Sequence, residues 1–416
     1  MTNSSSNRLG IVSYLRTALV LIASVVCLLT CSSADATIFK TYITGETDPG
    51  TAGEKHVIFT VTFDPAVPLS GTVVTTLEDS VHRLDGIDFI PGTGKTEVVA
   101  AGTHLVGADG FVGRYDVAAG VVLLPSYFPS TKSAPVPPPR TTHPSTVKAT
   151  DTHFYFVENQ FGFEAADPHR IMRAPFGAAP PIPAAEVVLD SASSGGLVQY
   201  EGIEIHDGRM YFFALDPATA DPALKRALFS VPLSPGGLPT GAPVKKLGGL
   251  TRGSGLTGVG PSVSDGSDEL DYDPFTGLIW GTNIISGELI AYDPVADVGA
   301  VVVSAGDVTG GDPGGLGLLG MTINGIRSTG DGHLVFVGLE GIVASIDLSG
   351  FIGGGGLGLG TITDADVKAL IFAPGDYAFD DLTPLDVVVP EPSTFLLLAL
   401  GVSGLVVVVC RRRRRS

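Results

Sequence analysis

Short apolar runs alternate with turn residues along most of the chain. The runs are mostly four to eight residues long and rich in Val, Ile, Phe and Tyr, and with 55 glycines and 30 prolines hardly any stretch of helical period exceeds about three turns. This pattern predicts an all-β body. The clearest strand candidates are 56–63, 71–77, 96–101, 152–157, 209–214, 278–282, 289–292 and 334–337.

A loose internal repeat groups these strands into units of roughly 50 to 70 residues. Each unit opens on a short segment with a small apolar core and acidic residues, and continues with a turn, a strand, a second turn and a strand. The opening segments are 84–89, 200–205, 269–273, 321–326 and 379–382, and a unit with a degenerate start covers 147–158.

Four-stranded units of this length predict a single β-propeller. Six units give six blades; five or seven blades and a β-sandwich are the alternatives. Segment 378–385 is expected to supply the innermost strand of a sheet whose other strands come from 37–77, so that the two ends of the body close the ring. The sequence YDPFTG at 272–277 resembles a turn found in known β-propellers.

The first 36 residues have the pattern of a signal peptide. Arg8 and Arg16 precede an apolar stretch at 18–30, and Ala34 and Ala36 place small residues where signal peptidase cleaves. We therefore expect a signal helix that is removed, and a propeller domain at 37–386.

All three cysteines lie outside this body, at Cys27, Cys31 and Cys410. The body can form no disulfide, so burial of its core must stabilise it. Cys31 also gives an alternative interpretation of the leader, in which Cys31 is the lipid-modified cysteine of a lipoprotein. Thr30, however, stands where Gly, Ala or Ser is preferred.

The last segment, 387–416, has a different pattern. A Pro-Glu-Pro-Ser-Thr motif at 390–394 leads into 16 apolar residues at 395–410, which span roughly 24 Å as a helix against a hydrocarbon core of ~30 Å. We expect this run to be a transmembrane helix. Because basic flanks stay on the cytoplasmic side, the body before it is expected outside the inner membrane. The motif residues are Pro390, Glu391 and Pro392, and the basic flank is Arg411, Arg412, Arg413, Arg414 and Arg415.

This order of motif, apolar segment and arginine block resembles the PEP-CTERM sorting tail of exported bacterial proteins, and the resemblance covers the tail alone. It implies that an exosortase-type enzyme recognises and processes the tail. Together with signal peptidase, it implies a protein of a Gram-negative-type cell that is held at the inner membrane by the C-terminal helix. Delivery to the cell envelope or the extracellular matrix then follows.

The net charge of the body limits the classes of partner that it can bind. Without the leader and the tail, 18 basic and 41 acidic residues remain, a net charge of −23. Binding to phosphate backbones needs clustered Lys and Arg, so we expect no nucleic-acid partner. Divalent cations, polyamines, neutral glycans or another protein fit this surface better.

Sequence motifs for catalysis are absent from the body. Residues 91–96 (PGTGKT) end like a P-loop, but the first glycine of that motif is replaced by Phe89 and a strand follows instead of a helix, so we expect a hairpin turn. There is no Gly-x-Ser-x-Gly elbow and no His-Glu-x-x-His.

Acidic residues recur in the opening segments of the units, which line the axis of a propeller. If they converge there, their oxygens suit Ca²⁺, and no other cofactor is expected. The alternative is that they form turns and solvated blade edges. The candidate metal ligands are Asp85, Asp88, Glu201, Glu204, Asp271, Asp273, Asp380 and Asp381, and His206 lies in the same segments.

These features favour an exported, non-enzymatic propeller that acts as a binding or structural surface. The alternative is a secreted propeller enzyme that acts on glycans or on lactone or ester substrates through its channel carboxylates, with or without Ca²⁺. Paired carboxylates at the floor of an open channel are expected for the enzyme, and a plugged apolar axis for the scaffold.

Overall fold

The computed structural model describes residues 37–104, 110–124, 142–143, 146–160, 169–176, 185–220, 226–250, 269–283, 288–303, 323–338, 341–350, 367–373 and 375–388. Nearly all of them belong to one compact unit, Phe39–Val388. The expected signal helix with its cleavage site, and the sorting tail with its expected transmembrane helix, lie outside the described residues. Within the described ranges, no helix is long and apolar enough to cross a membrane.

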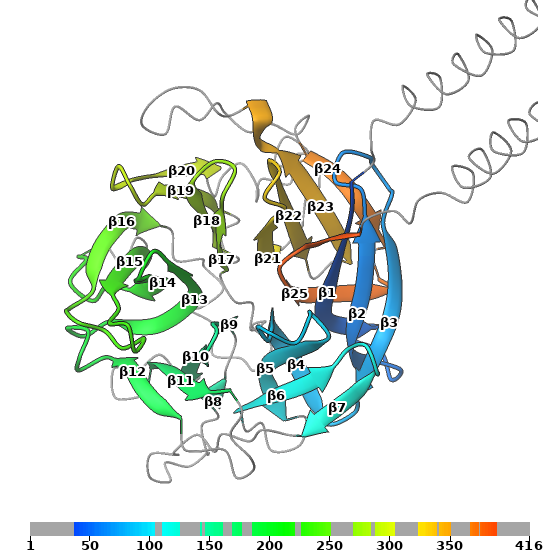
Figure 1. Cartoon of the computed structure of the whole chain (residues 1–416), viewed down its shortest axis with the longest axis horizontal. Helices are drawn as coiled ribbons and strands as arrows, with labels where there is room; N and C mark the ends of the chain where they lie inside the picture. The colour runs from blue at the N-terminus through cyan, green and yellow to red at the C-terminus, as the bar shows by residue number, and fades with distance from the viewer. Residues whose placement is uncertain are drawn as a thin grey trace, which may run out of the picture. The chain divides into compact units, whose positions relative to one another are not determined.

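Six antiparallel sheets make up the body (Figure 1). Blade 1 combines the two ends of the body; its strands are β25 (Tyr377–Leu382), β1 (Ile38–Thr47), β2 (Lys55–Phe63) and β3 (Thr72–Asp79), with β26 (Asp386–Val388) also paired to β1. Blade 2 contains β4 (His82–Phe89), β5 (Glu97–His104), β6 (Gly110–Asp116) and β7 (Val121–Leu124). Blade 3 contains β9 (Val147–Ala149), β10 (His153–Gln160), β11 (Arg170–Pro175) and β12 (Glu186–Asp190), with the short β8 (Thr142–His143) beside β10.

The other three blades each run in chain order from the innermost strand outwards. Blade 4 contains β13 (Val198–His206), β14 (Arg209–Leu215), β15 (Arg226–Pro232) and β16 (Val244–Leu250). Blade 5 contains β17 (Leu270–Asp273), β18 (Leu278–Asn283), β19 (Glu288–Asp293) and β20 (Val298–Val303). Blade 6 contains β21 (Ile323–Ser328), β22 (His333–Gly338), β23 (Ile342–Asp347) and β24 (Val367–Phe372), with the 3₁₀ turn η3 (Leu348–Gly350) after β23.

The innermost strands β25, β4, β9, β13, β17 and β21 contact one another in that order around a ring, and β21 meets β25 again. The body is therefore a six-bladed β-propeller, as the repeat predicted. The opening segments of the repeat are the innermost strands, and the PGTGKT sequence is the turn between β4 and β5.

Each blade is apolar on both faces, which is why its strands read as continuous hydrophobic runs. On β5, Val98 and Ala100 pack toward blade 1, whereas Val99 and Ala101 pack toward blade 3. The buried hydrophobic residues form six clusters among the described residues, one at each blade-to-blade interface. Successive side chains of a strand point to opposite faces, so one strand serves two interfaces.

Blade 1 closes the ring through β25 and β1. The strands pair antiparallel, with Gly45 opposite Phe379. Gly45 allows the close approach, because a Cβ there would lie 2.1 Å from the carbonyl oxygen of Ala378. Beyond β25, the Thr41 hydroxyl donates to the carbonyl of Thr383 at 2.8 Å, across 342 residues of sequence.

Removing β25 tests this closure. A chain that ends at Ala373 loses Phe379 and Leu382 from the cluster between blades 1 and 6. Large apolar truncations cost about 2–5 kcal/mol each, which approaches the total stability of about 5–15 kcal/mol of a typical domain. We expect the shortened body to lose its cooperative thermal transition.

A chain that ends at Val388 is the control, since it keeps β25 and β26 and should melt like the intact body. Equal melting of the two truncated chains would contradict closure by β25.

Candidate functional site

Charged side chains from the innermost strands meet at the axis of the propeller. We call this group the axial cluster. Its members are Asp88 on β4, Lys148 on β9, Glu204 on β13, Asp271 on β17, Arg327 on β21, Asp381 on β25, and Glu269, which directly precedes β17.

Two cations organise the axial cluster. Lys148 Nζ lies 2.6 Å from Glu204 Oε2 and 3.7 Å from Asp271 Oδ1. Arg327 lies 3.2 Å from Glu269 Oε2 through Nη1 and 3.6 Å from Asp381 Oδ1 through Nη2. The side chains around Arg327 are at most 1% exposed, and those of Lys148 and Asp271 are 14% and 12% exposed.

Three carboxylates of the cluster also bind the backbone of the next blade. Asp381 accepts the N–H of Ile87 at 2.9 Å, Asp88 accepts that of Ala149 at 2.8 Å, and Asp271 accepts that of Ser328 at 2.7 Å. In each pair, the carboxylate belongs to an innermost strand and the N–H to the innermost strand that follows it around the ring. The acidic residues of the repeat therefore fasten consecutive blades together.

Formal charges in the axial cluster do not balance, because five carboxylates face two cations. Burial raises the pKa of Glu204 to about 7 and that of Asp381 to about 6, although Lys148 and Arg327 oppose the shifts. Burial alone would lower the pKa of Lys148, but Glu204 and Asp271 raise it. Both cations stay charged, and the cluster takes up protons near neutral pH.

The structure brings four of the eight predicted metal ligands into the axial cluster: Asp88, Glu204, Asp271 and Asp381. Each already accepts a bond from an N–H group or from Lys148. The calcium site therefore stays a prediction, and any cation has to compete with these donors.

The other four predicted ligands have separate partners. Glu201 pairs with Arg226 at 2.5 Å, and Asp380 accepts a bond from Asn324. Asp273 accepts the N–H of Thr276 and so holds the turn between β17 and β18. Asp85 is buried near Arg83, with 3.5 Å between Oδ1 and Nε.

His206 lies apart from the ion pairs, since its ring stacks on Tyr272 with 3.6 Å between centroids. A different group has metal-ligand geometry: in the described part of the chain, only Glu46, Glu54 and His56 place three ligand atoms within 4.8 Å of one another. No sequence motif indicated this group, although the β1–β2 register puts Glu46 opposite His56. Lys148 and Arg327 were not predicted either, because the repeat of the opening segments is marked by acidic residues and neither cation belongs to a basic motif.

Comparison with known proteins identifies the tail. Residues 388–415 match the PEP-CTERM protein-sorting motif, which confirms the resemblance seen in the sequence. This motif implies that the protein is exported and that an exosortase-type enzyme processes it at the membrane. A search of curated proteins finds no match to this chain.

Several solved structures are similar to this chain. A chain of a nidogen/laminin complex is 11% identical, with a TM-score of 0.50 over 83% of this chain and 98% of that chain. A puromycin hydrolase is 13% identical, with a TM-score of 0.42 over 73% of this chain and 45% of that one. A Bacteroides thetaiotaomicron protein of unknown function is 14% identical, with a TM-score of 0.41 over 82% and 88%. At 11% identity, the likeness to the chain of the nidogen/laminin complex shows the fold alone.

Replacing Arg327 tests whether the axial ion pairs stabilise the fold. Arg327→Met leaves Glu269 and Asp381 buried without their cation, and breaking a buried pair in this way costs about 3–5 kcal/mol. Denaturant unfolding should show this loss in the free energy of unfolding.

Lys55→Met is the control, because the Lys55–Glu78 pair is half exposed and such pairs contribute little. An unchanged unfolding midpoint in Arg327→Met would contradict a stabilising role for the axial pairs.

The raised carboxyl pKa values predict how stability depends on pH. For Glu204 and Asp381, the pKa in the folded state lies above the ordinary values of 4.5 and 3.8. At pH values between the ordinary pKa and the raised pKa, the folded state therefore binds more protons than the unfolded state. Stability should therefore fall as the pH rises from about 5 to about 8, and Glu204→Gln should flatten this dependence. Thermal melting at a series of pH values measures it.

Glu97→Gln is the control, since Glu97 forms a partly exposed pair with Arg114 outside the cluster. Asp79 does not affect stability in this pH range. Burial would raise its pKa, but hydrogen bonds from His82 and Tyr115 lower it below the ordinary value. The stability that Asp79 contributes is therefore lost only below about pH 4. A slope that Glu204→Gln leaves unchanged would contradict the assignment.

Proposed function

We propose that this protein is a non-enzymatic propeller that presents a binding or structural surface in the cell envelope or the extracellular matrix. The sorting motif at 388–415 implies its export. After signal peptidase removes the leader, the C-terminal helix holds the protein at the inner membrane until an exosortase-type enzyme processes the tail.

The occupied axis carries this proposal. A propeller enzyme that uses channel carboxylates must offer them to a substrate. Here the carboxylates of the axial cluster are at most 12% exposed and are bonded to cations and backbone N–H groups. The axis is filled, although with charged side chains instead of the apolar ones expected for a scaffold. This arrangement supports a structural role for the axial acids and a binding role for the outer surface.

Protein binding is compatible with this architecture, since the chain of similar fold in the nidogen/laminin complex belongs to a protein assembly. A glycan is the other candidate partner, because a strongly acidic surface does not repel neutral sugars. The alternative of a secreted propeller enzyme acting on glycans, lactones or esters would need a second site away from the axis.

Cell fractionation tests the export route. An epitope inserted after Ser126 should appear outside the cytoplasm in the intact protein. Deletion of Arg411 to Arg415 should impair orientation and processing, because the basic flank fixes the direction of the apolar segment.

The body of the deletion variant should still melt normally, which separates sorting from folding. An epitope that stays cytoplasmic in the intact protein would contradict both the signal peptide and the sorting route.

A further inference from the structure

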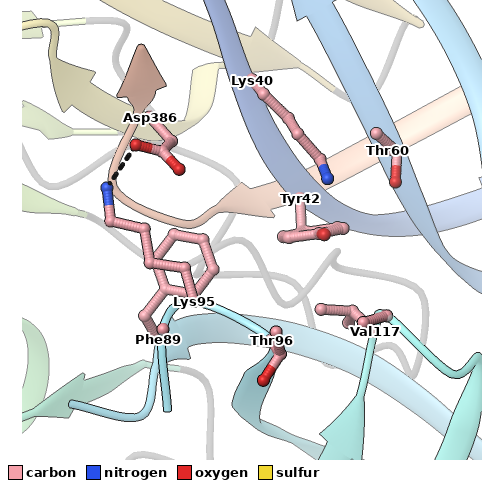
Figure 2. A pocket seen from close by; sticks show the side chains of 10 residues that line it. Lys40, Tyr42, Thr60, Phe89, Lys95, Thr96, Val117 and Asp386 are labelled. Atoms are coloured by element: carbon pink, nitrogen blue, oxygen red, sulfur yellow. Dashed lines mark hydrogen bonds and ion pairs between the residues drawn. The ribbon is translucent and has the colours of Figure 1, made fainter. Parts of the chain in front are cut away.

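A cleft of about 310 Å³ opens between blades 1 and 2, away from the axial cluster. Strands β1, β2 and β26 form one side, and the β4–β5 turn and the end of β6 form the other (Figure 2). The side chains that matter for its chemistry are Lys40, Tyr42, Phe89, Lys95, Thr96 and Asp386. Its volume lies near the lower end of the range for small-molecule sites.

Side chains of β1 alternate between the two faces of the strand, and this alternation places Lys40 in the cleft. Tyr42 faces blade 2 and packs edge-on against Phe89, with 5.8 Å between the ring centroids. Lys40 lies two residues earlier, on the same face but past the end of the apolar cluster. It is half-buried, and its ammonium lies 4.8 Å from the centroid of the Tyr42 ring. No ion pair in the described part of the chain includes Lys40.

The second lysine of the cleft already holds a carboxylate. Lys95 occupies the β4–β5 turn with a φ of 61°, a conformation that favours glycine. Its ammonium lies 2.8 Å from Asp386 Oδ1, and this pair is exposed to solvent at 44% and 47%. Figure 2 shows the Lys95–Asp386 pair joining the two sides of the cleft, and Lys40 apart from this pair near Tyr42. An exposed pair is weak, so Asp386 can exchange its bonds with a ligand.

We propose that this cleft binds a carboxylate-bearing sugar of the uronic acid type. The sugar carboxylate pairs with Lys40. It does not have to displace Asp386, because Asp386 is bound to the other lysine of the cleft, Lys95. The ring hydroxyls have Asp386 and the Thr96 oxygen as acceptors, and the Tyr42–Phe89 pair forms an apolar wall. The net charge of −23 on the body opposes the approach of an anion, so the local attraction has to come from the Lys40 ammonium and from Lys95, which shares its charge with Asp386. This inference rests on the binding role proposed above and names its site and ligand class.

Titration with glucuronate tests the site. The purified full-length protein should bind glucuronate, and should bind glucose at least tenfold more weakly at the same ionic strength. Lys40→Met should weaken glucuronate binding at least tenfold, whereas Lys55→Met, which removes the same charge elsewhere, should leave binding unchanged. Calorimetric titration measures each affinity, and thermal melting shows that both variants are folded.

A second measurement uses the unaltered protein. Saturating glucuronate should slow acylation of the Lys40 amine by an amine-reactive reagent and leave acylation of Lys55 unchanged. Equal binding of glucose, equal weakening in the two lysine variants, or acylation of Lys40 at an unchanged rate would each overturn the proposal. Localisation plays no part in these measurements, so their failure is distinct from a failure of export.

Discussion

The unpaired inner edge of each blade is the constraint on which the rest of the propeller depends. The innermost strand of a sheet has one neighbour, so its N–H groups on the axial side need acceptors, and a buried N–H without one costs about 1–3 kcal/mol. Asp381, Asp88 and Asp271 supply acceptors to the following blades. Because the acceptor and the donor belong to different blades, satisfying an edge also sets the distance between two sheets.

This solution has electrostatic consequences. Carboxylates close enough to serve neighbouring strands repel one another, and burial disfavours their ionised forms. Lys148 and Arg327 relieve part of the repulsion by contacting acids of more than one blade. The six apolar clusters lie between the blades, whereas the carboxyl groups of Glu204 and Asp381, whose pKa values burial raises, lie at the axis.

Local patterning made the fold predictable. Strands buried on both faces read as continuous apolar runs, and acidic segments at regular intervals marked the innermost strands. These two signals were enough to predict the six blades and the closing strand. The partner of each acidic residue could not be predicted from the sequence. Glu201 and Glu204 look equivalent in the sequence, yet the register of β13 against β14 shifts on both sides of Glu201. Glu201 consequently meets Arg226, whereas Glu204 meets Lys148. Irregular pairing of this kind depends on neighbouring blades.

Ring closure by β25 makes the complete fold depend on the last strands of the body. Strand β1 lies at the beginning of the body, but its partner ends at Leu382, shortly before the sorting motif begins at residue 388. Contacts across more than 300 residues of sequence form late and slowly. A body that lacks β25 therefore remains an open array with exposed strand edges. The ring is completed by the segment that directly precedes the sorting motif, so a body cut short before β25 lacks both the closing strand and the signal that follows it.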